Sequence, residues 1–574
     1  MAILEGAPKG VGTVPDRIDR RSFISRGLLA AGGVAAAGGA GSLLAACSSG
    51  SGGSGPTASG PRDGVSTATP RKGGALTFGV EAEEQGFDPA TGRFDETGVL
   101  YARTVFDPLT ILADDGTVQP YLAKAVTPNA DYSEWTITAR PGVMFHDGTP
   151  CDGAAIAGSL EHFLKGLLGL TLNTVTNISV PSSDTVLITL KQPWIPFPAY
   201  LAGGIGGQPG YIVAPSMIAD PNGSQRPVGT GPFRFKEWSP NDHFTAVRNE
   251  SYWRSGLPHL DSITYRPISD AQQRANALQA GNIDIMHTDL PESILQFRDD
   301  ASYGYVDDSQ HIVGEPDMNF IMINTQDPLM KDIRVRRAMA MAVNPRQYAT
   351  VVDKGVNTPT NQPFVPGTPY YAADSGYPAY NPTQAKALVQ EVARDIGKPV
   401  AFTLSSTPSA YAVQAVQFLQ NQLELVGMKV TLTQVQQADQ INQALSGTFQ
   451  TTSWRQFAAV DPDLNYLWWS PTEIFGTGPQ AIAPNFARNN DPQIEVLLQQ
   501  GRQSTDPTKR AEAYQAIAKR LNQDIPYIWT DRTTWAVVAR SRVQNFNNPA
   551  TPAGAKAYGM IVGTIWSPQI WLSA

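Results

Sequence analysis

Residues 400–435 read VAFTLSSTPSAYAVQAVQFLQNQLELVGMKVTLTQV, and this segment sets the expected fold class. Residues 400–405 have the composition of a strand, and residues 429–435 alternate apolar with polar side chains. Between them, apolar side chains recur at helical spacing: Val413, Val416, Leu419, Leu423 and Val426. Because a crossover helix joins parallel strands, this βαβ unit predicts an α/β fold with a mostly parallel sheet that is covered on its faces.

Other segments extend this interpretation along the chain. Asp506 and Pro507 are typical of a helix N-terminus, and residues 525–538 are expected to return as a strand. Arg334, Arg336 and Arg337 are predicted to form the solvent-exposed cationic face of a helix. Residues 101–220 differ, because half-exposed strands near 134–139 and 184–190 are bounded by Pro and Gly. This pattern predicts that residues 101–220 form a separate α+β insertion.

Composition indicates a large globular protein that does not bind nucleic acid. The chain has 574 residues, of which 41% are hydrophobic and 16% charged. This exceeds what one hydrophobic core supports, so two or more lobes are expected. The net charge is −8 without basic clusters, which argues against a nucleic-acid partner.

The N-terminal segment predicts export and a lipid anchor. Arg20 and Arg21 precede an apolar Ala/Gly/Leu run, as in Tat signals, and the run ends in Leu-Ala-Ala before Cys47, as in a lipoprotein signal. Residues 1–46 are therefore predicted to be a signal peptide, with a lipid on Cys47. The alternative, a membrane-spanning helix over 27–46, is disfavoured by its glycines and alanines. Residues 47–72 are rich in Ser, Gly, Pro and Thr and predict a disordered linker.

Four sequence blocks, in order, resemble family 5 extracellular solute-binding proteins of ABC importers, the dipeptide, oligopeptide and nickel-binding family. They are YLAK at 121–124 with RPGVMFHDGTP at 140–150, PVGTGPF at 227–233 with RNESYW at 248–253, ALQAGNID at 277–284, and NT at 324–325 with DIRVRRA at 332–338. The resemblance covers nearly all of the chain after the linker. It implies a two-lobed periplasmic-binding-protein-like fold of class II type, with the extra α+β domain.

The resemblance also implies domain limits and partners. Residues 73–100, 221–316 and 526–574 would form a discontinuous lobe I, residues 101–220 the insertion, and residues 317–525 lobe II, with hinges near Glu315-Pro316 and Asp524-Ile525-Pro526. The expected partners are a small organic solute or oligopeptide and the permease and ATPase subunits of an ABC transporter. A monomer without metal or cofactor is expected on the outer face of the cytoplasmic membrane, on its periplasmic or cell-wall side.

Two other functional classes remain as alternatives. A secreted hydrolase is disfavoured because the six His residues are scattered without HExxH, and no Gly-x-Ser-x-Gly elbow is found. A surface adhesin or chaperone would need no closing cleft. The sequence thus favours a binding protein and not an enzyme.

The ligand site is expected around residues 453–462, which read SWRQFAAVDP. In peptide-binding relatives, a Gly-Trp-x-x-Asp segment supplies a carboxylate for the peptide ammonium. Here Phe457 stands at the Asp position, or Ala458 if an apparent one-residue insertion lies earlier. Trp454 and Arg455 are predicted to contact the ligand, with a buried core position as the alternative for Trp454. Asp461 is a substitute anchor or the start of a turn. Glu81, after the first strand, is also expected in the cleft. The ligand alternatives include oligopeptides, oligosaccharides and metal chelates.

Overall fold

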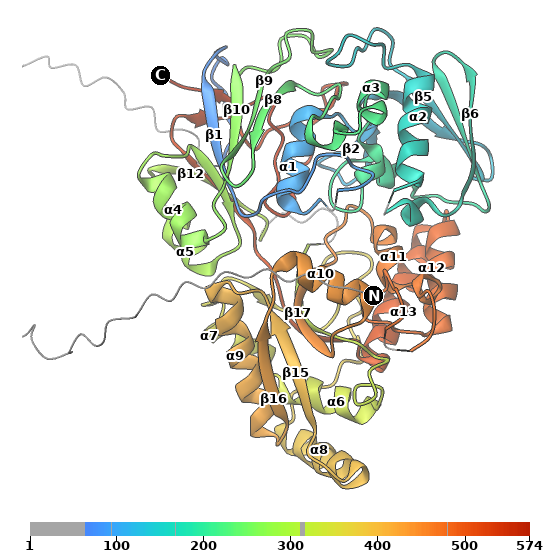
Figure 1. The fold of residues 1–574 in the computed structure, drawn as a ribbon, viewed down its shortest axis with the longest axis vertical. Coiled ribbons are helices and arrows are strands. Elements are labelled where there is room, and N and C mark those ends of the chain that lie inside the picture. The colour runs from blue at the N-terminus through green and yellow to red at the C-terminus, as the bar shows by residue number, and fades with distance from the viewer. Residues whose placement is uncertain (1–62, 93, 167, 310–315, 479) are drawn as a thin grey trace, which may run out of the picture. The chain divides into compact units, whose positions relative to one another are not determined.

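The computed structural model describes residues 63–92, 94–166, 168–309, 316–478 and 480–574 (Figure 1). The predicted signal peptide, with Arg20, Arg21 and Cys47, lies outside these residues, as do most of the predicted linker and the predicted hinge residue Glu315. In the part of the chain that is described, no helix has the length and apolarity to cross a membrane.

The first lobe is built on a seven-stranded mixed sheet in the order β12-β19-β11-β1-β10-β9-β8. The central strand β1 runs parallel to β10 and β11, whereas the outer pairs are antiparallel. The strands are β1 (Ala75–Val80), β8 (Phe233–Ser239), β9 (His243–Arg248), β10 (Ser262–Pro267), β11 (Ile285–Thr288), β12 (Tyr303–Asp307) and β19 (Ala536–Arg540). Three helices pack on this sheet: α1 (Glu96–Val105), α4 (Ala271–Gln279) and α5 (Pro291–Arg298). Distant parts of the sequence therefore share one hydrophobic core.

The insertion has a four-stranded antiparallel sheet in the order β4-β5-β7-β6. Along β5 and β7 the side chains alternate between buried and half-buried, because one face of the sheet packs on α2. Its elements are β4 (Ala123–Pro128), β5 (Glu134–Ala139), α2 (Gly153–Leu164), β6 (Val175–Ser182) and β7 (Thr185–Leu190), with the hairpin β2 (Thr110–Leu112) and β3 (Val118–Pro120) before it and α3 (Pro215–Ala219) after it.

The second lobe contains a six-stranded sheet in the order β14-β18-β13-β17-β15-β16. The predicted βαβ unit is present as β15, α9 and β16, and its strands pair in parallel from Ala401 with Lys429 to Ser406 with Gln434. The strands are β13 (Met318–Ile323), β14 (Thr358–Pro359), β15 (Ala401–Ser406), β16 (Lys429–Gln434), β17 (Thr451–Gln456) and β18 (Tyr527–Arg532). The expectation of a mostly parallel sheet is wrong, because β13 is antiparallel to both β17 and β18. β13 enters this lobe and β18 leaves it, so these neighbours run in opposite directions.

The position of β18 also corrects a predicted boundary. The sequence predicts that residues from 526 onward belong to the first lobe, yet Tyr527–Arg532 pair with β13 of the second. The chain crosses between the sheets at residues 533–535, where the Thr533 amide donates to the Asp317 carbonyl of the other crossing segment at 3.0 Å. Ile525, in the left-handed region, caps the preceding helix, so Ile525-Pro526 mark a helix end instead of a crossover.

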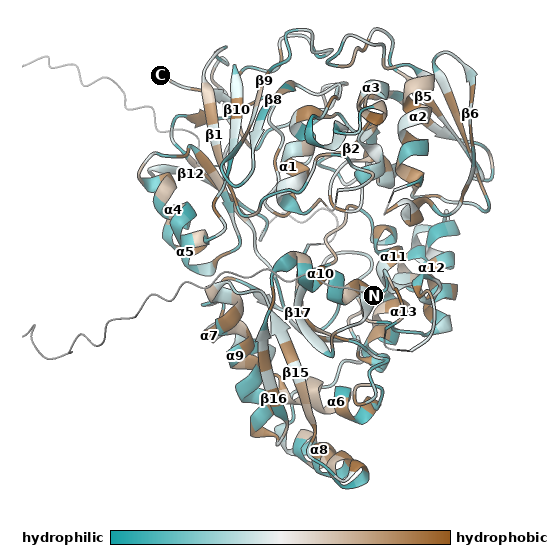
Figure 2. Cartoon of the chain, viewed as in Figure 1, coloured by the Kyte–Doolittle hydropathy of each residue, from teal (hydrophilic) through white to brown (hydrophobic). Residues whose placement is uncertain are grey.

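Amphipathic helices cover the second sheet. On α8, Ala385, Val389 and Val392 are buried while the other side is hydrophilic, as Figure 2 shows. The helices are α6 (Ile333–Ala342), α7 (Pro345–Val351), α8 (Pro382–Ile396), α9 (Ala410–Leu425), α10 (Gln437–Ser446), α11 (Tyr466–Trp469), α12 (Pro492–Gln503) and α13 (Pro507–Asp524). As predicted, Asp506 caps α13 and Pro507 opens it. The short strands β20 (Val543–Gln544) and β21 (Trp571–Leu572) pair near the C-terminus.

Candidate functional site

A cavity of about 1020 Å³ is lined by residues of both lobes and of the insertion. The first lobe contributes the ends of β1 and β11 and the start of α1, and the insertion contributes apolar side chains such as Phe163 and Ile205. The second lobe contributes the end of β17 and the starts of α9 and α10. The cavity is large enough for a small organic molecule or a short peptide.

One wall of the cavity is aromatic. The Trp454 and Phe486 rings meet edge to face with centroids 5.5 Å apart, and Trp468 lies 5.1 Å from Phe486. All three line the cavity and are half-buried, so part of each ring faces its interior. The Trp454 indole N–H donates to Gln456 at 2.8 Å, which fixes the ring orientation. This wall offers apolar contact area at low entropic cost.

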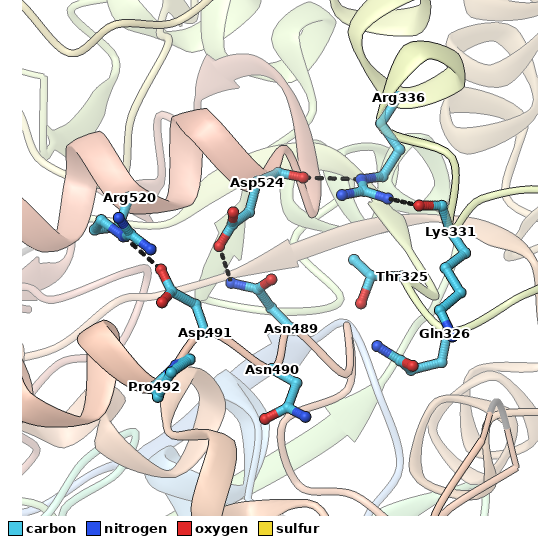
Figure 3. A pocket seen from close by; sticks show the side chains of 10 residues that line it. All are labelled: Thr325, Gln326, Lys331, Arg336, Asn489, Asn490, Asp491, Pro492, Arg520 and Asp524. Atoms are coloured by element: carbon cyan, nitrogen blue, oxygen red, sulfur yellow. Dashed lines mark hydrogen bonds and ion pairs between the residues drawn. The ribbon is translucent and has the colours of Figure 1, made fainter.

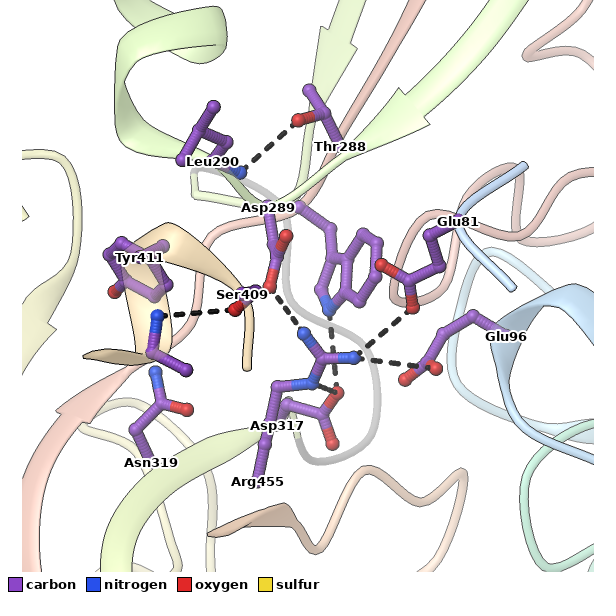
Figure 4. A network of polar contacts seen from close by, with 12 residues as sticks. Glu81, Glu96, Thr288, Asp289, Leu290, Asp317, Asn319, Ser409, Tyr411 and Arg455 are labelled. Atoms are coloured by element: carbon purple, nitrogen blue, oxygen red, sulfur yellow. Dashed lines mark hydrogen bonds and ion pairs between the residues drawn. The ribbon is translucent and has the colours of Figure 1, made fainter. Parts of the chain in front are cut away.

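Arg455, next along β17, lies in a cage of four carboxylates (Figure 4). Its Nη1 donates to Asp289, and its Nη2 lies 3.4 Å from Glu81 and 3.5 Å from Glu96. Its Nε lies 3.5 Å from Asp317, and the guanidinium carbon lies 4.5 Å from the centroid of Trp535. We call these five residues, Glu81, Glu96, Asp289, Asp317 and Trp535, the carboxylate cage.

The carboxylate cage joins the two lobes. Glu81, Glu96 and Asp289 belong to the first lobe, Arg455 belongs to the second, and Asp317 and Trp535 lie at the crossovers. Glu81 is positioned by its backbone N–H, which donates to His287 Nε2 at 3.0 Å. Trp535 donates its indole N–H to Asp317 at 3.3 Å.

Burial changes the protonation of the cage. It raises the pKa of Glu81 from 4.5 to about 7; Arg455 opposes this shift and Asp289 adds to it. Burial likewise raises the pKa of Glu96, again against the attraction of Arg455. Glu81 and Glu96 therefore retain protons at a pH where exposed glutamates have lost theirs, because burial disfavours their charged form.

The other predicted residues differ in their placement. Phe457 lines the cavity, but its ring is buried in an aromatic cluster, stacked on Phe320 at 5.1 Å, and its φ of 88° lies in the left-handed region. Asp461 lies outside the cavity lining. Its carboxylate accepts from Arg510 and from the Asp463 amide, so it starts a turn. Trp454, Arg455, Phe457 and Glu81 thus share the cavity, and Asp461 does not.

Four members of the site were missed in the sequence: Glu96, Asp289, Asp317 and Trp535. They come from a helix start, a strand end and two crossover segments. The only local signal is that Asp289 directly follows the strand β11. No spacing motif connects these residues, because they are far apart in the sequence and meet only through the fold of the first lobe and the crossovers.

A second, polar pocket of about 270 Å³ lies among α6, α12 and α13 (Figure 3). Arg336 is only 8% exposed, which corrects its predicted place on a solvent face. Its Nε donates to the Asp524 carbonyl at 2.8 Å and its Nη1 to the Met330 carbonyl at 2.5 Å. Arg336 thus binds the last carbonyl of α13, as cationic side chains do at helix ends, and ties it to the segment before α6. This pocket is explained by packing within the second lobe.

Comparisons with known proteins agree with this architecture. The family model described as bacterial extracellular solute-binding proteins, family 5 Middle, matches residues 117–474. A glutathione-binding protein, GsiB, of Pectobacterium atrosepticum is 28% identical over 449 residues, which are 76% of this chain and 84% of that protein.

Two solved structures are similar in fold. The Helicobacter pylori protein DppA in complex with the peptide STSA matches with a TM-score of 0.76 at 21% identity, over 88% of this chain and 99% of that one. The Bacillus subtilis oligopeptide-binding protein AppA in complex with a nonapeptide matches with a TM-score of 0.75 at 20% identity, over 88% of this chain and 100% of that one. These likenesses confirm the predicted two-lobed α/β fold class.

Proposed function

Because this chain belongs to the family 5 bacterial extracellular solute-binding proteins of ABC transporters, we propose that it captures an organic solute between its lobes and delivers it to the permease of its importer. One observation carries the proposal: a cavity of about 1020 Å³ has walls from both lobes and from the insertion. The lobes are connected by two crossovers, near residues 316–317 and 533–535, which suit a hinge that opens and closes the cavity.

The ligand is proposed to be a peptide-like or other organic solute. The relatives include glutathione-binding and peptide-binding proteins. A peptide anchored by its free amine within residues 457–461 is disfavoured, because an apolar residue, Phe457 or Ala458, occupies the position expected for the acidic anchor and Asp461 is paired with Arg510. An oligosaccharide or a metal chelate is the alternative ligand. Catalytic turnover is not part of the proposal.

Native mass spectrometry of the purified protein tests this function. We expect a bound small molecule that is released on denaturation, present at about one per protein, and of a size that fits the cavity. Titration of the stripped protein with that molecule should restore the complex. Purified protein that carries no solute, and takes up none from an extract of its host's growth medium, would contradict the proposed function.

The proposed location is the outer face of the cytoplasmic membrane, with the monomer anchored by a lipid on Cys47. This rests on the twin arginines Arg20 and Arg21 and on the Leu-Ala-Ala before the cysteine. Cell fractionation tests it. Cys47→Ser should release the protein from membranes, whereas Arg20→Lys with Arg21→Lys should block export. A Cys47→Ser protein that still sediments with membranes would refute the lipid anchor.

A further inference from the structure

The cavity lining carries an excess of acidic groups, two of which, Glu81 and Glu96, have a pKa raised by burial. Among the described lining residues, acidic side chains outnumber basic ones by six to two, and lysine is absent: Glu81, Asp95, Glu96, Asp270, Asp289 and Asp317 against Arg274 and Arg455. Asp95 and Asp270 accept backbone N–H groups at the starts of α1 and α4, so the helix N-termini offset part of their charge. The other four carboxylates belong to the carboxylate cage and share one guanidinium.

Arg274 offsets only part of this excess, through its charge, which lowers the pKa of Glu81. Its side chain is buried, at 1% exposure, and donates to the carbonyl groups of His287 at 3.0 Å and Ile268 at 2.6 Å. Within the described part of the chain, no carboxylate lies within ion-pair distance of it. Arg455 is the cation that faces the cage, and its N–H groups are already directed at Asp289, Glu81, Glu96 and Asp317.

An anionic ligand is therefore a poor fit. Its charge would lie beside several carboxylates in a partly desolvated cavity, where like charges repel strongly. The same surroundings favour a cation. Arg455 itself shows that the cage accepts a planar cation, held by oxygens around its edge and by the face of Trp535.

Other parts of the cavity lining are apolar. Trp454, Phe486 and Trp468 form a half-buried aromatic wall, and the insertion adds Phe163, Leu168 and Ile205. These apolar surfaces gain free energy only when an apolar group covers them. The ligand therefore needs an apolar part as well as a charged one.

We infer that the solute is an organic cation with an apolar or aromatic body, whose ammonium or guanidinium group faces Glu81, Glu96 and Asp289 while its body packs against Trp454 and Phe486. This rests on the proposed function, because it names the class of solute held in the same cavity. It separates the chain from its glutathione-binding relatives in ligand charge, since glutathione carries two carboxylates and one ammonium.

The test offers the protein an equimolar mixture of four probes. Three are blocked tripeptides of one skeleton, N-acetyl-Xaa-Phe-Xaa-amide with Xaa as Lys, Gln or Glu, and the fourth is glutathione. Native mass spectrometry then gives the retained fraction of each. We expect the Lys peptide to be retained at least tenfold more than the Gln peptide, and the Glu peptide and glutathione to be retained least.

Variants localise the preference. Glu81→Gln with Asp289→Asn should reduce the Lys-over-Gln ratio to below threefold, whereas Glu391→Gln, an exposed carboxylate paired with Arg334 on the second lobe, should leave it unchanged. Equal retention of the Lys and Glu peptides, preference for glutathione, or retention of no probe would overturn the inference. The proposed function is judged separately. If the protein co-purifies with a neutral or anionic solute, the proposed function stands and only the inference that the solute is a cation fails.

Discussion

Two arginines of the second lobe show how the balance of acids and bases separates a structural contact from a binding site. Arg502, on α12, faces one carboxylate: its Nε lies 3.1 Å from both oxygens of Asp463, and the pair is almost fully buried. Arg455 faces four carboxylates and keeps a quarter of its side chain exposed, in a cavity. The first site pairs one acid with one base and is closed, whereas the second has more acids than bases and is open.

The surroundings of the two arginines differ in the same way. Asp463 also accepts from the Trp194 indole at 2.8 Å, and its backbone carbonyl accepts from Tyr200 at 2.5 Å. Trp194 and Tyr200 belong to the insertion, so this neutral pair fastens the insertion to the second lobe. In this contact one cation matches one carboxylate in a closed site, whereas the carboxylate cage has more acids than bases and opens on a cavity.

The largest effect is expected at the neutral pair. Asp463→Asn leaves the Arg502 guanidinium buried without a counter-charge and should lower the free energy of unfolding by about 3–5 kcal/mol. Urea denaturation measures this loss. Asp395→Asn, which removes an exposed partner of Arg334, is the control and should leave the unfolding midpoint unchanged. If Asp463→Asn lowered the free energy of unfolding no more than Asp395→Asn does, the Arg502 pair would stabilise the fold no more than an exposed ion pair, and the comparison would fail.

A buried acid pair without an arginine sharpens the comparison. Asp353 and Asp531 are both 0% exposed; Tyr411 donates to Asp353 at 2.6 Å and Asn319 to Asp531 at 2.8 Å. Burial, followed by repulsion from Asp531, raises the pKa of Asp353 from 3.8 to about 8, and burial raises the pKa of Asp531 to about 6.

Because the folded state then binds more protons than the unfolded state, stability should fall as the pH rises from about 4 to 8. Asp353→Asn removes one of these charges and should recover about 2–3 kcal/mol at pH 8 relative to pH 5. Thermal unfolding across this range measures the change. Equal pH dependence in the variant and the wild type would show that the pair does not titrate in this window.

The sequence predicted local features better than contacts between segments that are distant in the sequence. The β15-α9-β16 unit was predicted because hydrophobic periodicity records burial within a short segment. The antiparallel neighbours β13 and β18 were not, because their pairing joins residues that are about two hundred positions apart in sequence. The same limit applies to the site. Trp454 and Arg455 could be placed in the cavity because one short segment contains both. Glu96, Asp289, Asp317 and Trp535 could not, because they belong to four separate segments of the chain.

Chemical rescue distinguishes the open cage from the closed pair. Arg455→Ala should lower stability by about 1–2 kcal/mol, less than a sealed pair loses, because cavity water and protonation relieve the carboxylates. Millimolar methylguanidinium should then raise the unfolding temperature of Arg455→Ala in a saturable way, beyond the effect of equal potassium chloride. Arg502→Ala is the matched control and should not respond, because its site is 1% exposed. If methylguanidinium stabilised both variants, or neither, the distinction between an open cage at Arg455 and a closed pair at Arg502 would be wrong.

The smallest effect concerns ligand affinity at the edge of the open site. Trp454 lines the cavity and Asp461 does not, although the two are close in sequence. Trp454→Ala should weaken binding of the co-purified solute by about 1 kcal/mol, roughly fivefold, because the half-buried ring loses its contact with the ligand while Phe486 and Trp468 remain. Asp461→Asn should leave affinity unchanged and cost only stability, since its carboxylate is bound to Arg510. Calorimetry on both variants measures this difference. A large loss of affinity for Asp461→Asn, with little for Trp454→Ala, would move recognition from the aromatic wall to the turn at 457–462 and would restore an amine-anchored peptide as the ligand.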